Sequence, residues 1–127
     1  MKIKESTHEL SRLRLQLQRL LNDLKGSLEV VFGRAPLVKG SVYEQSRKCG
    51  KPRCACTGGA LHKSLVLSWS HRGKTRLLSI PSERRVELRR KSLAYLRFRA
   101  ARARVSKIDR EILTAIDRIE KLRREEP

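Results

Sequence analysis

Apolar residues near the beginning of this 127-residue chain recur at steps of three and four, which is the spacing of one helix face. Ser6 followed by Glu9 matches a capping box, and Gly33 with Pro36 ends the pattern. The sequence therefore predicts an amphipathic helix from Ser6 to about Phe32. Its buried stripe comprises Leu10, Leu13, Leu17, Leu20, Leu24 and Val31.

The period changes in the middle of the chain, where short runs of β-branched, aromatic and leucine residues replace the helical spacing. Strands are predicted at 41–45, 64–70 and 74–80, with a turn at His71-Arg72-Gly73 joining the last two. We assign Trp69 to the core of this sheet rather than to base stacking, because a lone tryptophan in a small sheet usually packs inside. Three such strands are marginally stable alone.

A long helix is predicted from about Ser82 to Arg124, and it carries two apolar stripes about 100° apart. One stripe comprises Val86, Leu93, Leu96, Ala100 and Ala103. The other is a heptad seam of Ala94, Phe98, Ala101, Val105, Ile108, Ile112, Ala115, Ile119 and Leu122.

Because the first helix is shorter, we expect it to cover one stripe only, which leaves the seam to a second copy of the chain. The homodimer would be built on Phe98, Val105, Ile108, Ile112, Ile119 and Leu122. An alternative breaks the helix near Ser106 and folds its end back as a third helix. The heptad phase continues through that point, which favours the dimer.

Three cysteines and a histidine lie within fourteen residues, spaced C-x4-C-x-C-x5-H. Cys49, Cys54, Cys56 and His62 supply the four ligands of a tetrahedral Zn²⁺ site. Four protein ligands leave no open position, so the predicted zinc is structural. A disulfide would leave one cysteine over, and a third hypothesis makes these thiols reactive groups beside a cluster of bases.

Taken together, the patterns predict an α+β fold. Long N- and C-terminal helices, paired as an antiparallel hairpin or coiled coil, flank a zinc-stapled three-stranded antiparallel β module. The predicted segments are a coiled-coil-type helix at 1–33, the zinc-binding module at 34–81 and a basic helix at 82–127. We expect a cytoplasmic, nucleoid-associated protein without a membrane partner, because no run of eighteen apolar residues and no signal peptide is present.

The charge is strongly basic and unevenly placed. The chain has 31 lysines and arginines against 13 acids, a net charge of +18. Residues 33–110 hold 21 of these bases and only 4 acids, whereas the segments on either side are close to neutral. A block of this kind is typical of a protein that binds a polyanion.

The cysteine region also resembles a known family. Gly40-Ser41-Val42, the run from Cys49 to Cys56, His62 and Gly73-Lys74-Thr75-Arg76 are similar to small, uncharacterised bacterial proteins with a C-G-K-P-x-C-x-C motif. Genes of that family often lie near transposase and recombinase genes. The resemblance implies a role in DNA mobility but identifies no reaction.

These observations favour a dimeric, zinc-containing protein that binds double-stranded DNA as an accessory or regulatory factor of a mobile element. Arginine pairs with guanine edges, and both bases neutralise phosphate. RNA remains a competing ligand. The predicted contacts are Arg47, Lys48, Lys51, Arg53, Arg72, Lys74, Arg76, Arg84, Arg85, Arg89, Arg90 and Lys91.

Two other classes of function are less consistent with the sequence. In the first, the helices form an adaptor that binds a recombinase or transposase, and the basic surface only assists. An enzyme is the weakest option, because the sequence offers no acidic pair, no open metal site and no phosphate-binding glycine loop. Glu44 is the only acid in residues 33–81, too few for two-metal phosphoryl transfer.

Overall fold

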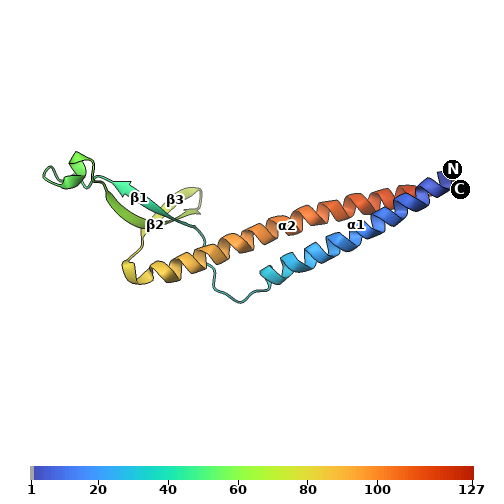
Figure 1. Ribbon diagram of the computed structural model, residues 1–127, viewed down its shortest axis with the longest axis horizontal. Helices are drawn as coiled ribbons and strands as arrows, with labels where there is room; N and C mark the ends of the chain where they lie inside the picture. The colour runs from blue at the N-terminus through green and yellow to red at the C-terminus, as the bar shows by residue number, and fades with distance from the viewer. Residues whose placement is uncertain (1) are drawn as a thin grey trace. The chain divides into compact units, whose positions relative to one another are not determined.

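The computed structural model describes residues 2–127 and contains two long helices and a three-stranded antiparallel sheet (Figure 1). The predicted α+β class is confirmed. The first residue of the predicted segment 1–33 lies outside the described residues. In chain order the elements are α1 (Lys2–Val31), β1 (Ser41–Arg47), the 3-10 helix η1 (Ala55–Gly58), β2 (His62–His71), β3 (Lys74–Ser79), the 3-10 turn η2 (Ser82–Arg84) and α2 (Arg85–Arg123).

The chain divides into two compact units. The helical unit combines the residues up to Gly33 with residues 98–127, and the sheet unit comprises residues 34–97. Thus α2 contributes its first thirteen residues to the sheet unit and the rest to the helical unit. The predicted boundary at residue 33 coincides with a boundary between the units, whereas the last predicted segment is shared between them.

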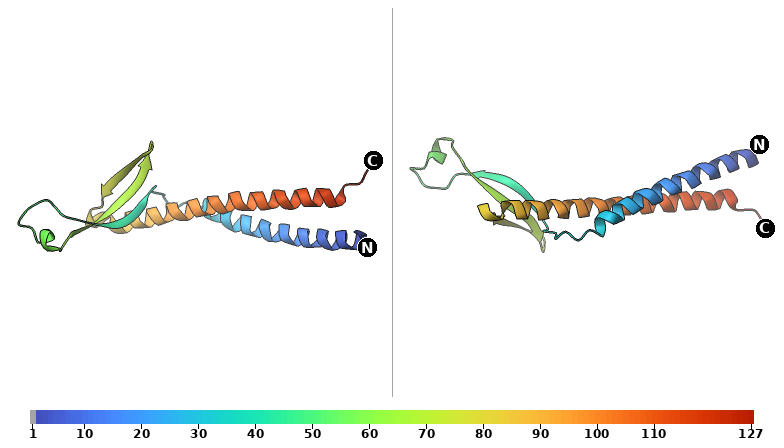
Figure 2. Two further views of the ribbon diagram at one scale, coloured as in Figure 1. Left: turned by 90° about the horizontal axis from the view of Figure 1, so that it is seen from above. Right: turned by 60° about the horizontal axis from the view of Figure 1, so that its bottom comes forward.

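The helical unit is a pair of antiparallel helices, α1 and the later part of α2, which lie side by side in all views (Figures 1 and 2). Its interior contains Leu20 of α1 and Ala101, Ile108 and Ala115 of α2, each at most 6% exposed. The alanines let the helices approach closely at these positions.

The heptad seam of α2, predicted to bind a second copy of the chain, packs instead against a helix of the same chain. This corrects the sequence prediction. Among the described residues of this unit α1 is the one other helix, so it is α1 that covers the seam. Ile108 is buried, and Phe98, Val105, Ile112, Ile119 and Leu122 are half-buried.

The stripe left uncovered is the other one. Val86, Leu93 and Leu96 are 78%, 53% and 44% exposed. The physical reason is that the seam keeps its heptad spacing along the part of α2 that pairs with α1. The second stripe begins at Val86, in the part of α2 that belongs to the sheet unit. The homodimer itself stays a prediction, and α1 already covers part of the surface on which it was expected to form.

Two further predictions about the helices are corrected. α1 begins at Lys2 with Glu5 in its first turn, so Ser6 lies inside the helix and is not its N-cap. Lys, Ile and Glu tolerate helical conformation well enough to extend the helix upstream. α2 runs without a break from Arg85 to Arg123, so the alternative with a third helix after Ser106 is wrong.

The sheet unit has strand order β1-β2-β3, with Val42 opposite Leu67 and Leu67 opposite Leu78. The core on one face consists of Leu65, Leu67, Ile80 and Leu88, and Trp69 packs against it as predicted. The β2–β3 connection is the two-residue loop Arg72-Gly73, with φ of 51° and 77°. Positive φ at both positions is typical of a type I′ turn, whose twist matches that of the strands.

The start of α2 is attached to the sheet by buried contacts. Leu88 and Ser92 are 3% and 2% exposed, and the Ser92 hydroxyl donates a 2.7 Å hydrogen bond to the carbonyl of Gly40. The N–H of Val38 donates to the carbonyl of Lys91 at 3.1 Å. These bonds fix the rotation of α2 about its axis, which decides which arginines face the strands.

None of the helices that the structure describes combines the length and apolar composition needed to cross a membrane.

Candidate metal centre

The cysteines lie on the connection between β1 and β2, which projects beyond the strands (Figure 2). Fourteen residues, 48–61, separate the two strands, although hairpin loops usually have two to five residues. Arg47 is paired with His62, so the histidine stands at the base of the loop where β2 begins. This connection, residues 48–61, is called the metal loop below. It is organised by its own turns and by the cluster of side chains inside it.

The four predicted ligands come together in the structure. One ligand atom from each of Cys49, Cys54, Cys56 and His62 lies within 4.8 Å of all the others. The Sγ of Cys54 is 3.0 Å from Nε2 of His62, and the Sγ atoms of Cys49 and Cys56 are 3.5 Å apart. Ligand atoms about 3.3–3.8 Å apart are expected around a tetrahedral ion with bonds of about 2.0–2.3 Å. These residues could therefore hold a metal ion.

Tight turns bring the cysteines together. The N–H of Cys54 donates to the carbonyl of Lys51 at 3.2 Å, which closes a turn over residues 51–54, and Gly50 just before it has a left-handed φ of 82°. The 3-10 helix η1 then carries Cys56 into the interior, where its side chain is fully buried. Gly59, with φ 111°, ends η1 and donates its N–H to the carbonyl of Cys56.

Hydrogen bonds adjust the acidity of the thiols. The pKa of Cys54 is lowered to about 6, first by the N–H of Cys56 and then by the side chains of Cys56, Cys49 and His62. The N–H of Lys51 lowers the pKa of Cys49. Hydrogen bonds from His62 to the thiolates of Cys49 and Cys54 raise the pKa of the imidazole. Cys54 is therefore mostly a thiolate at neutral pH, which is the form that binds metals.

Cys56 behaves differently. The N–H of Cys49 donates to its Sγ at 3.4 Å and by itself lowers the pKa of that thiol. Burial and the neighbouring thiols outweigh this bond, and the pKa of Cys56 is raised. A positive ion between the sulfurs would reverse that repulsion, because it stabilises all three thiolates together.

A cysteine next to a histidine is also the arrangement of a thiolate nucleophile. Cys54 and His62 alone would be enough to form such a nucleophile. Cys49 and Cys56 have no part in it, yet their sulfurs lie within the same 4.8 Å cluster. A converging set of four ligand atoms is what a metal ion requires, and the arrangement therefore favours a metal centre over a nucleophile.

The predicted nucleic-acid contacts do not form one surface. Arg47, Lys48, Lys51 and Arg53 lie on or beside the metal loop, at the end of the sheet where β2 begins. Arg72 and Lys74 lie at the opposite end of β2, which is ten residues or about 30 Å long. The metal loop and the β2–β3 turn are therefore separate basic regions.

The start of α2 belongs with the metal-loop end of the sheet. Arg85 and Arg89 lie beside Lys63 and Glu44, close to where β2 begins. Arg84 and Lys91 both contact Glu87, at 3.6 and 2.6 Å. The remaining predicted contacts are Arg76 on β3 and Arg90 on α2, both exposed.

Sequence reasoning missed Glu44 and Lys63 as members of this region. Their side chains form an exposed ion pair of 3.8 Å across the β1–β2 ladder. The alternation of the strands would have placed them on one face. The register that brings them beside α2, however, depends on where the metal loop begins and ends.

Comparison with known proteins gives a family but no activity. No curated protein and no solved structure significantly matches the chain. A family profile described as "Domain of unknown function (DUF6788)" matches residues 7–90, which include most of α1, the whole sheet, the cysteine cluster and the start of α2. Since this match covers more than half of the sequence, the chain belongs to the DUF6788 family.

Proposed function

We propose that this protein binds nucleic acid, with double-stranded DNA as its ligand, and that a structural Zn²⁺ ion holds its metal loop. The observation that carries the proposal is the positive charge left without partners in the sheet unit. In the described part of the chain, ion pairs reach only Lys63, Arg84 and Lys91 among the bases of this unit.

Zinc is the metal that fits the ligands best. Three thiolates and one imidazole are soft and borderline ligands, which favour Zn²⁺ over Mg²⁺ or Ca²⁺. Three thiolates with Zn²⁺ carry one net negative charge, and nearby Lys48, Lys51 and Arg53 offset it. With all four positions taken by protein, the ion would stabilise the loop and present its bases without activating water.

Binding to a polyanion explains the unpaired bases of the sheet unit better than a role in keeping the protein hydrated does. The bases without ion pairs near the metal loop are Arg47, Lys48, Lys51 and Arg53, and those on the first turns of α2 are Arg85, Arg89 and Arg90. Residues 111–127, by contrast, hold four bases against five acids, and Arg118 pairs there with Glu9 and Arg124 with Glu120. The sheet unit, residues 34–97, holds sixteen bases against three acids, and this excess is what a polyanion would neutralise.

The salt dependence of binding tests the nucleic-acid proposal. Fluorescence anisotropy with duplex DNA should give a slope of log affinity against log salt of about −5 or steeper if six phosphates are neutralised. Charge reversal of Arg84, Arg85, Arg89 and Arg90 to Glu should abolish binding. Reversal of Arg118, Arg123 and Arg124 is the matched control and should have a much smaller effect. Equal loss in both variants would mean that the charge is diffuse and would overturn the proposal.

Parallel titrations with single-stranded DNA and RNA of the same length decide the ligand. Tighter binding to RNA would keep the basic surface as the binding site and make RNA its ligand instead of DNA.

Metal analysis of protein purified without chelator should find about one zinc per chain. Folded protein without metal would contradict the zinc assignment.

A second candidate function is an adaptor that binds a recombinase or transposase through its helices. The observation in its favour is the set of large apolar side chains exposed on the helical unit. Leu21 and Phe32 of the first segment are 62% and 75% exposed, and Leu113 and Ile116 of α2 are 53% and 46% exposed. An adaptor would have no affinity for nucleic acid at moderate salt without its partner, which separates the two functions.

The resemblance to proteins encoded beside transposases supports an accessory or regulatory role in a mobile element. A homodimer would favour paired or inverted sites on DNA. Its interface would have to use exposed residues such as Leu113 and Ile116, because the seam of α2 is covered. Light scattering at micromolar concentration measures the oligomeric state, and a monomer would rule the dimer out.

A further inference from the structure

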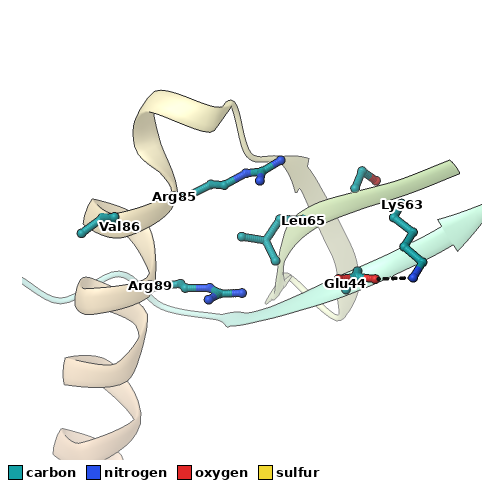
Figure 3. A pocket seen from close by; sticks show the side chains of 7 residues that line it. Glu44, Lys63, Leu65, Arg85, Val86 and Arg89 are labelled. Atoms are coloured by element: carbon teal, nitrogen blue, oxygen red, sulfur yellow. Dashed lines mark ion pairs between the residues drawn. The ribbon is translucent and has the colours of Figure 1, made fainter.

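A hollow of about 270 Å³ lies between the first turns of α2 and the strands β1 and β2 (Figure 3). From α2 it is lined by Arg85, Val86 and Arg89, and from the strands by Glu44, Lys63 and Leu65. The side chains of Arg85 and Arg89 extend from the helix toward the strands (Figure 3). All of these residues belong to the sheet unit.

The hollow carries excess positive charge. Three cations and one carboxylate line it, and Lys63 is the partner of that carboxylate at 3.8 Å. Neither Arg85 nor Arg89 takes part in an ion pair among the described residues. The two guanidinium groups therefore remain available for an anion with about two negative charges.

The rotation of α2 explains why these two arginines face the strands. Leu88 and Ser92 are buried against the sheet and mark the inner side of the helix. At about 100° per residue, Arg85 and Arg89 lie about 60° and 100° from Leu88, on the same flank. Arg90 lies about 160° away, on the outer side. The same helix therefore offers an arginine that faces the hollow and one that does not.

The size and lining of the hollow restrict the ligand. Its 270 Å³ is at the lower limit of pockets for small organic ligands, which begin at roughly 300 Å³, so a phosphate with an attached sugar would fill it. Leu65 provides apolar surface beside the charges. A phosphomonoester carries about −1.5 to −2 charges at pH 7, whereas a phosphodiester of the backbone carries about −1.

We propose that this hollow binds the terminal phosphate of a nucleic-acid strand, with Arg85 and Arg89 as its ligands. The inference rests on the proposed function and goes further, because it makes the protein selective for strand ends that carry a phosphate. Guanidinium groups bind phosphate oxygens through paired hydrogen bonds, which lysine cannot reproduce.

The test compares duplexes of one sequence whose ends carry either a phosphate or a hydroxyl group. Anisotropy should give about tenfold tighter binding of the phosphorylated duplex, since two charge-assisted contacts are gained. The double variant Arg85→Gln/Arg89→Gln should reduce this ratio to about one. The matched control Arg84→Gln/Arg90→Gln removes the same charge from the same turns and should keep the ratio. The single variant Arg89→Gln serves if the double variant does not fold.

Each alternative result has a distinct meaning. Equal affinity for both duplexes would overturn this inference and leave the proposed function intact, whereas no binding of either would overturn the proposed function. A ratio that survives in Arg85→Gln/Arg89→Gln would place the phosphate elsewhere and overturn the assignment. Competition by a nucleoside monophosphate as effective as by the phosphorylated duplex would make the ligand a free nucleotide and overturn the strand-end proposal.

Discussion

Arg118 near the end of α2 holds Glu9 near the start of α1 through two parallel hydrogen bonds, although 109 positions separate them. Nε donates to Oε1 at 2.6 Å, and Nη2 donates to Oε2 at 3.1 Å. A two-pronged contact fixes orientation as well as distance. The pair therefore defines the register of the antiparallel helices at the end where the chain begins and finishes.

The Glu9–Arg118 pair should make the helical unit sensitive to acid. Arg118 lowers the pKa of Glu9, first through the hydrogen bond and then through its charge. A carboxyl group with a lowered pKa stabilises the fold fully above its ordinary pKa near 4.5, and this contribution is lost as the pH falls through the lowered value. Glu9→Gln should therefore lower Tm slightly at pH 7 and have less effect at pH 3.

Both side chains are partly exposed, so the loss at pH 7 should be small. Arg118→Gln should reproduce it, and the double variant should be no worse than either single one. Additive losses in this double-mutant cycle would mean that the residues act separately. The exposed pair Glu120–Arg124, at 3.6 Å, is the control.

Ile108 should be a major contributor to the stability of the helical unit. It is 5% exposed, and Ile108→Ala should cost about 2–5 kcal/mol of the free energy of unfolding. Ile116→Ala, on a residue that is 46% exposed, should cost less than about 1 kcal/mol. Urea unfolding at two protein concentrations measures both. Since α1 covers the seam, the loss should not depend on concentration, and a marked dependence would restore the dimer seam.

The helices illustrate what a heptad pattern can and cannot predict. The spacing from Phe98 to Leu122 identified an inward-facing seam, and the structure buries Ala101, Ile108 and Ala115 and half-buries the rest. The pattern could not identify the partner, because a helix from the same chain and one from a second copy satisfy the same period. The structure identifies α1 as the partner, since α1 and the later part of α2 make up one unit.

The metal centre was more predictable than the basic surface, for a physical reason. Ligand types and their spacing within one loop are local, so Cys49, Cys54, Cys56 and His62 could be chosen from the sequence. The neighbours of Arg85, in contrast, depend on strand register and on the rotation of α2. Both are determined by Leu88, Ser92 and Gly40, whose contacts span about fifty residues.

Gly40 should be intolerant of any side chain. Its φ is 138°, and a Cβ placed on it would lie 2.7 Å from the carbonyl oxygen of Ser68 and 2.9 Å from a methyl group of Leu67. Gly40→Ala should therefore destabilise the sheet unit by about 1–3 kcal/mol. Gly26→Ala is a control of opposite sign, because Gly26 lies within α1 with no atom in the way, and alanine should stabilise the helix by about 1 kcal/mol. Thermal unfolding of both variants checks the pair.

Loss of the proposed metal ion should loosen the loop at 48–61 and leave the rest of the fold in place. Closing a fourteen-residue connection costs roughly 2 kcal/mol more than closing a two-residue turn, and the metal ligands offset this cost. Cys54→Ser removes one of the sulfur ligands. The pKa of Cys54 is about 6, so this thiol is already mostly ionised for metal binding at neutral pH. We expect the variant to lose its metal and to exchange amide hydrogens faster in this loop. Ser46→Ala, at an exposed position of β1, should retain the metal.

The core around Leu65, Leu67 and Leu88 does not include the loop, so its amide protection should survive in Cys54→Ser. The helical signal in circular dichroism should also remain, because α1 and the later part of α2 form a separate unit. Hydrogen exchange followed by mass spectrometry resolves the three regions. Unfolding of the sheet core together with the loop would mean that the metal holds the whole unit, and unchanged exchange in the loop would mean that it holds nothing there.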